Sequence, residues 1–460
     1  MKTQTCFAAF LLCVVTNTYG QLEWYNTYLS EAKQSMGVAV LGSKVYFAGG
    51  NNVSTYLTTV EIFDVKTREW DNSHNLTVPR DSPAGVSCGS KVFFAGGMNY
   101  NLGVTYSTID IYDTVTKEWT NASLSVPRFN ISAVSYGNKV LFSGGISFPW
   151  VVYDEVDIYN SETDEWTTEH LSQARGGIAG AVVGDLAIFA GGTLSEYTNS
   201  DRVDIYNFTT GEWSIDYLSL ARSNASATAA GNKVVIAGGY YNDWSSSAQV
   251  DIYEYPTGTW STASLSYPRC SNGNAATVND SACFVGGGDF YFGYVNPSLV
   301  IDIYDESTDS WSTDFLPQYP LVGHAVAAVK TDSIDHLIVA GGQNETGQVV
   351  STVSITGYYN DVQTVSSQQS AVSVYPNPTS GIVDFQWSDF DVRRTMGNVQ
   401  WTILKVYNAR GQEVATVLDG LWPGDQVVRW DATSLSAGIY HYRLEVGGQR
   451  SAVGGKIVKY

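Results

Sequence analysis

Charged residues are scarce in this sequence, and basic residues are the scarcer kind. Only 15% of the 460 residues are charged, and 25 Lys and Arg stand against 45 Asp and Glu, which gives a formal net charge of -20 at pH 7. Proteins that bind the phosphate backbone of nucleic acids rely on clustered cations. The composition therefore argues against a nucleic-acid-binding protein, and the low content of Lys, Glu and Leu argues against a mainly helical fold.

Cysteine is also rare. The chain has five, and two of them lie within the first 20 residues. The other three are Cys88, Cys270 and Cys283. An odd, scattered set of this kind is no disulfide framework, so we expect stability to come from packing.

Long apolar runs are missing as well, apart from one short run at the N-terminus. Lys2 is followed by the apolar segment Cys6–Val15, and the small residue Gly20 comes shortly after it. A positive start, an apolar core too short to span a bilayer and a small residue at the end are typical of a secretory signal peptide. We expect residues 1–20 to be this signal, and no later stretch is apolar enough to predict a transmembrane segment.

Two sequence marks repeat along the chain. A ten-residue pattern with an acid, Ile, an aromatic residue, a Thr and a final Trp begins at Glu61 and returns five more times. A Gly-Gly pair closes an apolar run at steps of 47, 48, 47, 47, 48 and 55 residues, at Gly49, Gly96, Gly144, Gly191, Gly238, Gly286 and Gly341. A period of this length predicts a β-propeller or another repeat array.

Each unit contains four short segments with strand character, which we call strands a to d. In the unit from Ser223 to Trp260 these read SNASATAAG, KVVIAGG, QVDIYEY and GTWSTAS. The Gly-Gly pair, the aromatic residue of strand c and the spaced Trp resemble the kelch repeat, whose family forms β-propellers. We therefore expect an all-β protein with a kelch-like propeller over residues 21–361.

The two marks are out of step at the ends of the repeat region. Trp24 precedes any Gly-Gly pair, whereas the last unit, residues 351–359, has no Trp after it. We predict seven blades, with Leu22–Tyr28 as strand d of the last blade, which closes the ring without an open sheet edge. A six-bladed ring with one irregular unit is the alternative.

The period ends at a polar linker, residues 362–371, and residues 372–460 differ in style. The motif Y-P-N-P-T-x-G from Tyr375, G-x-Y from Gly438 and the terminal Lys-x-x-Lys from Lys456 resemble the type A C-terminal sorting domain of cargo of the bacterial type IX secretion system. Short strands between Gly, Pro and Asn turns predict a small β-sandwich. The resemblance implies recognition by outer-membrane secretion machinery, removal of the domain, and a protein secreted or attached to the outer cell surface.

A cation precedes strand a in six units, and an acid lies on strand c of the same units. A ring of cations could draw acidic ligands inward, but the seventh unit has lost both groups and carries Leu321 and Ser354 instead. Joint loss indicates structural ion pairs. The expected pairs are Lys33 with Glu61, Arg80 with Asp110, Arg128 with Asp157, Arg175 with Asp204, Arg222 with Asp251 and Arg269 with Asp302.

The loops between strands b and c vary while the frame repeats, and strand connectivity places them on one face with the d–a connections. Aromatic residues among small polar ones are typical of recognition loops for protein epitopes and sugar rings, although some will pack loop on loop. We predict a ligand-binding face that contains Tyr100, Tyr106, Trp150, Tyr153, Tyr197, Tyr241, Trp244, Tyr291 and Tyr294.

Catalysis has little support in the sequence. No pair of the five His has metal-ligand spacing, and we place His336 in an inserted turn. Neither the ligand set of kelch-group copper oxidases nor the Asp box of sialidases is present. We expect no enzymatic activity, no cofactor and no metal, and a function in binding an extracellular protein or glycan. The alternative is a carbohydrate-active enzyme, of sialic acid mutarotase or lyase type, with carboxylates, an Arg and a His converging in the central channel.

Overall fold

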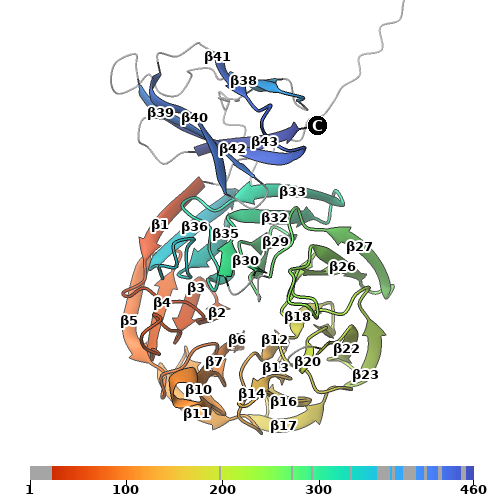
Figure 1. Cartoon of the computed structure of the whole chain (residues 1–460). Coiled ribbons are helices and arrows are strands. Elements are labelled where there is room, and N and C mark those ends of the chain that lie inside the picture. Colours follow the sequence, from red (N-terminus) through yellow and green to blue (C-terminus); the bar gives the residue numbers. More distant parts are fainter. Residues whose placement is uncertain are drawn as a thin grey trace, which may run out of the picture.

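The computed structural model describes residues 23–195, 198–270, 273–291, 294–331, 334–359, 373–375, 379–386, 400–408, 412–422, 427–446 and 452–459. The regular elements of these residues are strands, apart from one 3₁₀ turn. Seven four-stranded antiparallel sheets stand around a central axis, and two further sheets follow toward the C-terminus (Figure 1). The prediction of an all-β, seven-bladed propeller is confirmed. The predicted signal peptide, residues 1–20, and the predicted linker, residues 362–371, lie outside the described residues.

The blades, numbered along the chain, contain these strands in the order a to d. Blade 1 has β2 (Gly37–Leu41), β3 (Lys44–Ala48), β4 (Thr59–Asp64) and β5 (Glu69–Asn75). Blade 2 has β6 (Ala84–Cys88), β7 (Lys91–Ala95), β10 (Thr108–Asp113) and β11 (Glu118–Ser123). Blade 3 has β12 (Ser132–Tyr136), β13 (Lys139–Ser143), β16 (Glu155–Asn160) and β17 (Glu165–His170). Blade 4 has β18 (Ala179–Val183), β19 (Leu186–Ala190), β22 (Arg202–Asn207) and β23 (Trp213–Tyr217).

The remaining three blades continue the series. Blade 5 has β24 (Ser226–Ala230), β25 (Lys233–Ala237), β26 (Gln249–Glu254) and β27 (Thr259–Ser264). Blade 6 has β28 (Ala275–Val278), β29 (Ser281–Val285), β32 (Val300–Asp305) and β33 (Ser310–Phe315). Blade 7 has β34 (Ala325–Lys330), β35 (Ile334–Ala340), β36 (Thr352–Tyr359) and, from the N-terminal end, β1 (Glu23–Tyr28).

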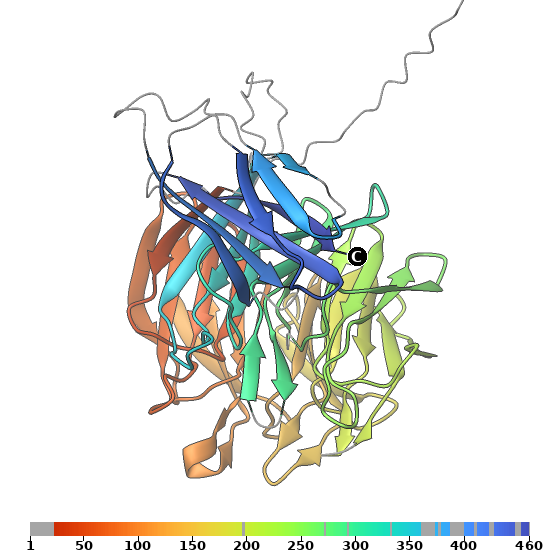
Figure 2. The same ribbon diagram turned by 45° about the horizontal axis from the view of Figure 1, so that its top comes forward.

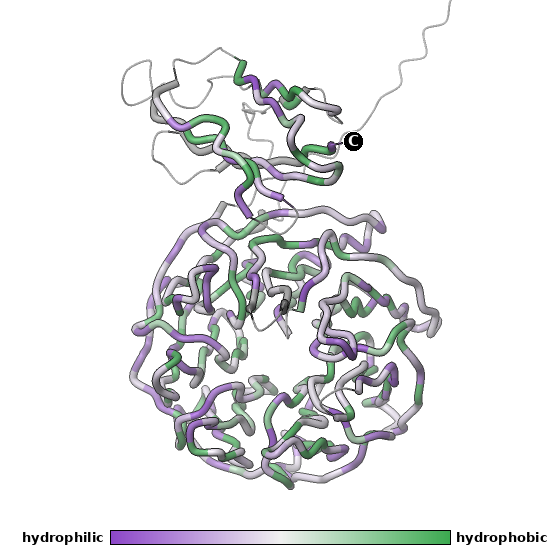
Figure 3. The backbone as a smooth tube through the Cα atoms, in the orientation of Figure 1, coloured by the Kyte–Doolittle hydropathy of each residue, from purple (hydrophilic) through white to green (hydrophobic). Residues whose placement is uncertain are grey.

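Residue pattern explains the position of each strand in its blade. Strands b, such as β25, are apolar and buried along almost their whole length, because they lie in the middle of a sheet covered by blades on both sides. Strands d, such as β27, alternate between half-buried and exposed residues and form the outer rim. Figure 3 shows this gradient, with hydrophobic stretches inside the ring and paler or hydrophilic ones at its edge. Each strand a contacts the strands a of both neighbouring blades, so these strands surround the axis.

The ring closes as predicted. β1 pairs antiparallel with β36, with a continuous register from Glu23 opposite Gly357 to Tyr28 opposite Thr352. The first described strand of the chain therefore completes the last blade, and β2 of blade 1 lies against β34 of blade 7. Closure covers the edge of β36, so the last blade has the same four-stranded order as the others.

The Gly-Gly pairs let neighbouring backbone approach closely. Gly96 has φ 65°, and a Cβ atom there would lie 2.2 Å from the carbonyl oxygen of Arg128. No L side chain could occupy that position without moving the backbone. The regular spacing of the Gly-Gly pairs along the chain thus reflects a steric requirement at the point where strand b meets the next d–a connection.

The strand-d tryptophans link consecutive blades. The indole Nε1 of Trp213 donates to Glu169 Oε2 at 2.6 Å, and that of Trp260 donates to Asp216 Oδ2 at 2.8 Å. In both cases the acceptor lies on strand d of the preceding blade. These tryptophans also pack against the strand-c tyrosine of their own blade, with a ring distance of 4.9 Å between Tyr206 and Trp213.

The predicted ion pairs are present in all six blades. The charged atoms lie 2.6–2.7 Å apart in five pairs, and Arg175 pairs with Asp204 in the sixth. Every one of the six cations has a fully buried side chain. Each pair joins the connection that enters a blade to strand c of that blade, so it ties consecutive blades together. Burial lowers the pKa of Arg175 to about 10.

Blade 7 replaces the ion pair by a neutral arrangement. Leu321 and Ser354 stand at the pair positions, and His324, only 4% exposed, lies nearby at the boundary with blade 6. Its Nε2 is 3.1 Å from the carbonyl oxygen of Val285, and its Nδ1 is 3.5 Å from Nδ2 of Asn274. These contacts fit a neutral ring that donates from Nε2 and accepts at Nδ1. Burial lowers the pKa of His324 from 6.5 to about 4.

His324 should make the propeller sensitive to acid. Between pH 6.5 and 4 the unfolded chain binds a proton at this residue that the folded chain resists, so stability falls as pH falls. The difference corresponds to about 3 kcal/mol at pH 4. We expect His324→Gln to lose that much less stability than the wild type between pH 7 and pH 4, as measured by chemical denaturation at both values.

The wild type and His324→Gln must be compared because other groups titrate in the same pH range. Burial raises the pKa of Asp81 and of Asp314 to about 6, so the folded chain keeps these protons longer and both residues favour folding as pH falls. Their effect is the same in the wild type and the variant and cancels in the difference. Identical pH dependence of the two proteins would contradict the role given to His324.

His336 is a point where the sequence prediction was wrong. It lies within β35, not in an inserted turn, and its Nδ1 is 2.9 Å from the carbonyl oxygen of Thr356. Strand b of blade 7 has seven residues, whereas the same strand has five in the other blades. Some of the extra residues of this unit therefore lengthen strand b.

The C-terminal region forms a small β-sandwich, as predicted. One sheet contains β37 (Ser373–Tyr375), β38 (Ile382–Gln386) and β41 (Val427–Asp431), and the other contains β40 (Glu413–Trp422), β39 (Gln400–Asn408), β42 (Gly438–Val446) and β43 (Ala452–Lys459). Both sheets contribute to one core, which includes Val383, Phe385, Leu404, Val406, Tyr440, Tyr442 and Ile457.

Candidate ligand-binding site on the loop face

The b–c loops are held in place by repeated backbone hydrogen bonds. In blade 3, Tyr153 N donates to Gly145 O at 3.1 Å, and Arg175 N of the following connection donates to Tyr153 O at 2.9 Å. Phe129 of the preceding connection forms an isolated β-bridge with Ile146. The same bonds recur in the other blades, so the b–c loops and d–a connections build one face of the ring, which we call the loop face.

Four of these loops carry small extensions of their own. β8 (Met98–Asn99) and β9 (Val104–Thr105) flank the 3₁₀ turn η1 (Tyr100–Leu102), and β14 (Ile146–Ser147) pairs with β15 (Val151–Val152). β20 (Thr193–Ser195) pairs with β21 (Thr198–Asn199), and β30 (Gly288–Tyr291) with β31 (Tyr294–Pro297). Figure 2 shows the extensions of blades 2 and 3, in orange and yellow, projecting beyond the ring.

A hollow lies on the loop face between the loops of blades 3, 4 and 5. Its volume is about 90 Å³. Pockets that enclose a small-molecule ligand usually measure roughly 300–1,000 Å³, so this hollow suits a group that rests in it without being enclosed. It is lined by Asn130, Ile146, Trp150, Thr193, Asn199, Ser223, Asn224, Tyr241, Asn242 and Trp244.

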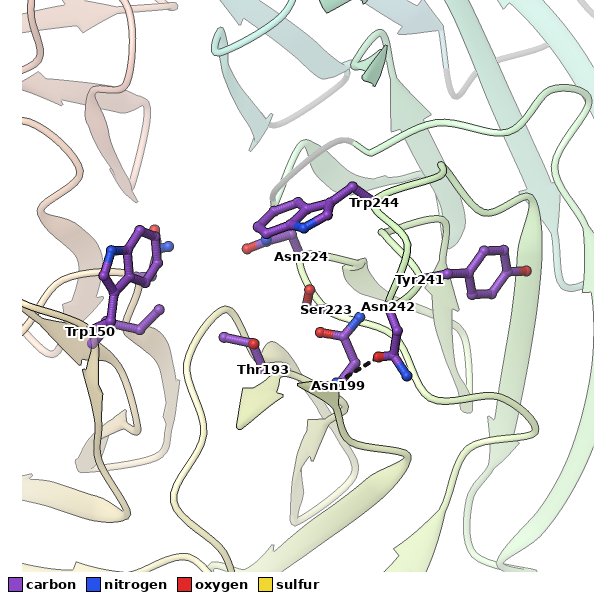
Figure 4. A pocket seen from close by; sticks show the side chains of 10 residues that line it. Trp150, Thr193, Asn199, Ser223, Asn224, Tyr241, Asn242 and Trp244 are labelled. Carbon is purple, nitrogen blue, oxygen red and sulfur yellow. Dashed lines mark hydrogen bonds between the residues drawn. The ribbon is translucent and has the colours of Figure 1, made fainter. Parts of the chain in front are cut away.

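Trp150 and Trp244 border this hollow from two blades (Figure 4). Their exposed fractions are 53% and 38%. Both have left-handed backbone, with φ 87° and 64°, and both backbone N–H groups close a turn, to Ser147 O and Tyr241 O. A bulky residue in this conformation is uncommon and costs about 1–3 kcal/mol. Two loops of similar construction thus present an indole to solvent at the border of one hollow.

The polar lining is only partly engaged within the protein. Asn199 N donates to Asn242 Oδ1 at 2.8 Å, and Asn199 Nδ2 donates to Tyr240 O at 2.9 Å, which fixes these two loops against each other. By contrast, Asn224 Oδ1 is buried and accepts no hydrogen bond. A buried acceptor without a donor costs free energy that a ligand hydroxyl or amide could recover.

The structure separates the predicted site residues into groups. Trp150, Tyr241 and Trp244 line the hollow, although Figure 4 shows the Tyr241 ring pointing away from the space between the two indoles. The Tyr241 hydroxyl accepts from Ser247 Oγ at 2.8 Å, and the Tyr153 hydroxyl lies 2.8 Å from Ser147 Oγ, so both phenols take part in local loop contacts.

The other predicted residues lie elsewhere on the face. Tyr100 is 67% exposed and its ring packs edge-on against Phe148 at 5.6 Å, while Tyr106 is half-buried at the base of its loop. Tyr291 and Tyr294 belong to β30 and β31, and only their backbone is described. Tyr197 lies outside the described residues.

Sequence reasoning missed the polar half of the hollow. Asn130 and Asn224 lie in d–a connections and not in b–c loops, and both have left-handed backbone, with φ 52°. The equivalent residues in four other units, Ser35, Ser82, Gly177 and Gly323, also have positive φ. The available signal for this backbone conformation was the residue type just before strand a, because Asn and Gly are favoured at positions with positive φ.

The described residues that line the hollow include no Asp, Glu, His, Lys or Arg. A buried carboxyl does occur elsewhere on the loop face: Asp81 is 5% exposed and accepts from Asn51 Nδ2 at 3.0 Å. Among the described residues, no group of three or more His, Cys, Asp or Glu is placed to hold a metal ion. The described part of the chain also contains no helix that could span a bilayer.

Comparison with known proteins agrees with this architecture. The kelch motif matches residues 34–72, 79–123 and 221–264, which fall on blades 1, 2 and 5. A solved structure described as "Structure of YjhT" matches with a TM-score of 0.50 and 15% sequence identity, covering 62% of this chain and 99% of that one. At this identity the similarity shows the fold alone. No curated protein matches the sequence.

The C-terminal region has its own match. The secretion system C-terminal sorting domain matches residues 373–459, the segment that forms the β-sandwich. This domain indicates secretion or attachment to the outer cell surface, and it implies an interaction with outer-membrane secretion machinery. The chain is a kelch-motif propeller protein with a C-terminal secretion system sorting domain.

Proposed function

We propose that the propeller is an extracellular binding module whose ligand docks at the hollow between blades 3, 4 and 5. The observation that carries this proposal is the convergence of Trp150 and Trp244, from different blades, on one hollow with uncharged polar walls. Exposed aromatic residues on loops held by a rigid frame are typical of recognition surfaces. Delivery outside the cell by the sorting domain places such a surface where it meets external ligands.

The composition of the hollow favours binding over catalysis. An acid–base step needs a group that titrates near the working pH, most often His, Asp, Glu or Lys. The described lining residues supply none of these. The strands a around the axis are built mainly of Gly, Ala, Val, Ser and Thr, as in β18 and β24, so the charged cluster expected for a sugar-converting enzyme has no counterpart on them.

Removing both indoles should abolish most of the binding. We expect Trp150→Ala/Trp244→Ala to weaken affinity for a ligand identified by glycan array or pulldown at least 30-fold, since one aromatic at a contact centre contributes about 2 kcal/mol. The melting temperature should not change, because both side chains are exposed loop residues.

Tyr136→Ala provides the matched control. Tyr136 is 44% exposed and ends strand β12 at the a–b turn, on the opposite face of the ring. This variant should bind like the wild type. Undiminished binding by a folded double variant would place the site elsewhere and would return attention to the enzyme alternative.

A further inference from the structure

The hollow offers an unusual combination of surfaces to a ligand. Two indoles supply flat apolar area, and four asparagines supply amide groups: Asn130, Asn199, Asn224 and Asn242. An amide both donates and accepts hydrogen bonds, as a hydroxyl does. A ligand with one apolar face and many hydroxyls matches this lining.

Several of the amides have hydrogen-bonding capacity to spare. Asn224 Oδ1 is buried without a donor, and Asn242 uses its Oδ1 for Asn199 N while its NH₂ group makes no hydrogen bond in the structure. Asn130 makes no side-chain hydrogen bond at all, although it lines the same hollow. The NH₂ group of Asn242 and the complete amide of Asn130 are therefore available to hydroxyl groups that enter the hollow.

The electrostatic surroundings disfavour an anionic ligand. No Lys or Arg lines the hollow, and Asp243 lies between Asn242 and Trp244 in the same loop. The hydroxyl and backbone N–H of Ser245 lower the pKa of Asp243, which is therefore ionised at neutral pH. The chain as a whole carries a formal charge of -20. A carboxylate or sulfate in the hollow would find no counter-ion and a repulsive field.

Size and polarity favour a sugar over a protein partner. Specific protein interfaces have a fully buried centre that is mainly apolar. Here six of the ten described lining residues are Asn, Ser or Thr, and the volume of the hollow is about 90 Å³. A hollow with a polar lining and two aromatic borders suits partial insertion of one ring better than an apolar protein anchor.

Resting on the proposed function, we propose that the ligand of this hollow is an uncharged glycan, held by one neutral sugar ring that contacts Trp150 and Trp244 and hydrogen-bonds to the asparagine amides. The apolar C–H face of the ring covers indole surface, and its hydroxyls engage Asn130, Asn224 and Asn242. The described lining offers an anionic sugar no cationic side chain to pair with.

The test measures binding of the full chain to an array that pairs neutral oligosaccharides with sialylated, sulfated and uronic-acid versions of the same cores. Saturation-transfer NMR with millimolar neutral oligosaccharides covers weak binding. We expect neutral glycans to bind at least fivefold more strongly than their anionic versions, and Trp150→Ala or Trp244→Ala alone to weaken that binding about tenfold or more.

Asn224→Asp tests the amide and the charge together, since it keeps the shape, removes the NH₂ group and adds a negative charge. It should weaken neutral-glycan binding at least fivefold. Asn52→Asp is the matched control, because Asn52 lies on the blade 1 loop of the same face and uses only its Oδ1, which accepts from Ser54 N and Thr55 N. That variant should bind normally.

Three outcomes would overturn the inference. They are preferential binding of anionic glycans, neutral-glycan binding that survives loss of both indoles, and no saccharide binding by either method. If a protein ligand is instead found and its binding needs Trp150 and Trp244, the neutral glycan is wrong but the proposed function stands. If no ligand depends on the two indoles, both fail.

Discussion

Asp157→Ala is expected to lower the free energy of unfolding by about 3–5 kcal/mol, the cost of leaving a buried charge without its partner. The Arg128 side chain is fully buried, and its Nη2 lies 2.7 Å from Asp157 Oδ2. Asp157 also accepts from Ser125 N at 3.0 Å and from Thr168 Oγ1 at 2.9 Å. Its removal therefore leaves the buried guanidinium without a counter-charge, and Ser125 and Thr168 lose an acceptor, where blades 2 and 3 meet.

An exposed pair of similar length provides the control. Lys91 Nζ lies 2.8 Å from Asp164 Oδ1, but the Asp164 side chain is 75% exposed. Water solvates both charges when such a pair is broken, so Asp164→Asn, which keeps a residue type that tolerates the φ of 57° here, should cost at most about 1 kcal/mol. Chemical denaturation of the two variants, followed by tryptophan fluorescence, gives the comparison. Equal losses would show that burial does not govern the strength of these pairs.

A double variant separates the two roles of the buried pair. Arg128→Met/Asp157→Leu removes both charges together and leaves apolar side chains in the same space. Replacement of a buried ion pair by apolar residues is often neutral or stabilising, whereas loss of one partner is not. We expect the double variant to regain most of the stability lost in Asp157→Ala. A double variant as unstable as the single one would point to a packing defect.

The repeat explains why so much of the fold could be predicted from the sequence. The blades bury the same strand positions, and six of them contain the same ion pair, so what is inferred for Asp157 also applies to Asp204 and Asp251. The absence of the pair in blade 7 was predictable for the same reason. The substitute was not, because His324 has no counterpart in the period, and its role depends on contact with Val285 of another blade.

The candidate site was less predictable because it breaks the repeat. Variation of the b–c loops indicated Trp150 and Trp244. The sequence could not show that these two border one hollow, because their blades are not adjacent and the loop geometry decides which side chains converge. Asn130 and Asn224 come from d–a connections, which the sequence analysis placed on this face without naming a binding residue in them. Contacts between loops from different blades depend on tertiary structure and leave no periodic signal.

Trp24→Ala is expected to destabilise the protein as strongly as Trp213→Ala, by about 3 kcal/mol, the lower end of the range for truncation of a buried Trp. Trp24 lies opposite Thr356 in the β1–β36 pair and packs, half-buried, on the core between blades 6 and 7. Trp213 holds the equivalent strand-d position in blade 4 and is also half-buried. If β1 is an integral strand of blade 7, its position at the N-terminal end of the propeller should not reduce its contribution to the free energy of unfolding.

The alternative is that β1 rests on a ring that is stable without it. The contacts argue against this, because Trp70 of blade 1 donates from Nε1 to Thr27 Oγ1 at 2.8 Å and so packs on β1 as other strand-d tryptophans pack on the preceding blade. Melting temperatures of the two variants decide between these readings. A drop in Trp213→Ala with none in Trp24→Ala would mean that β1 is dispensable. Equal drops would mean that the two ends of the propeller are held together by the same wedge of aromatic residues that joins every other pair of blades.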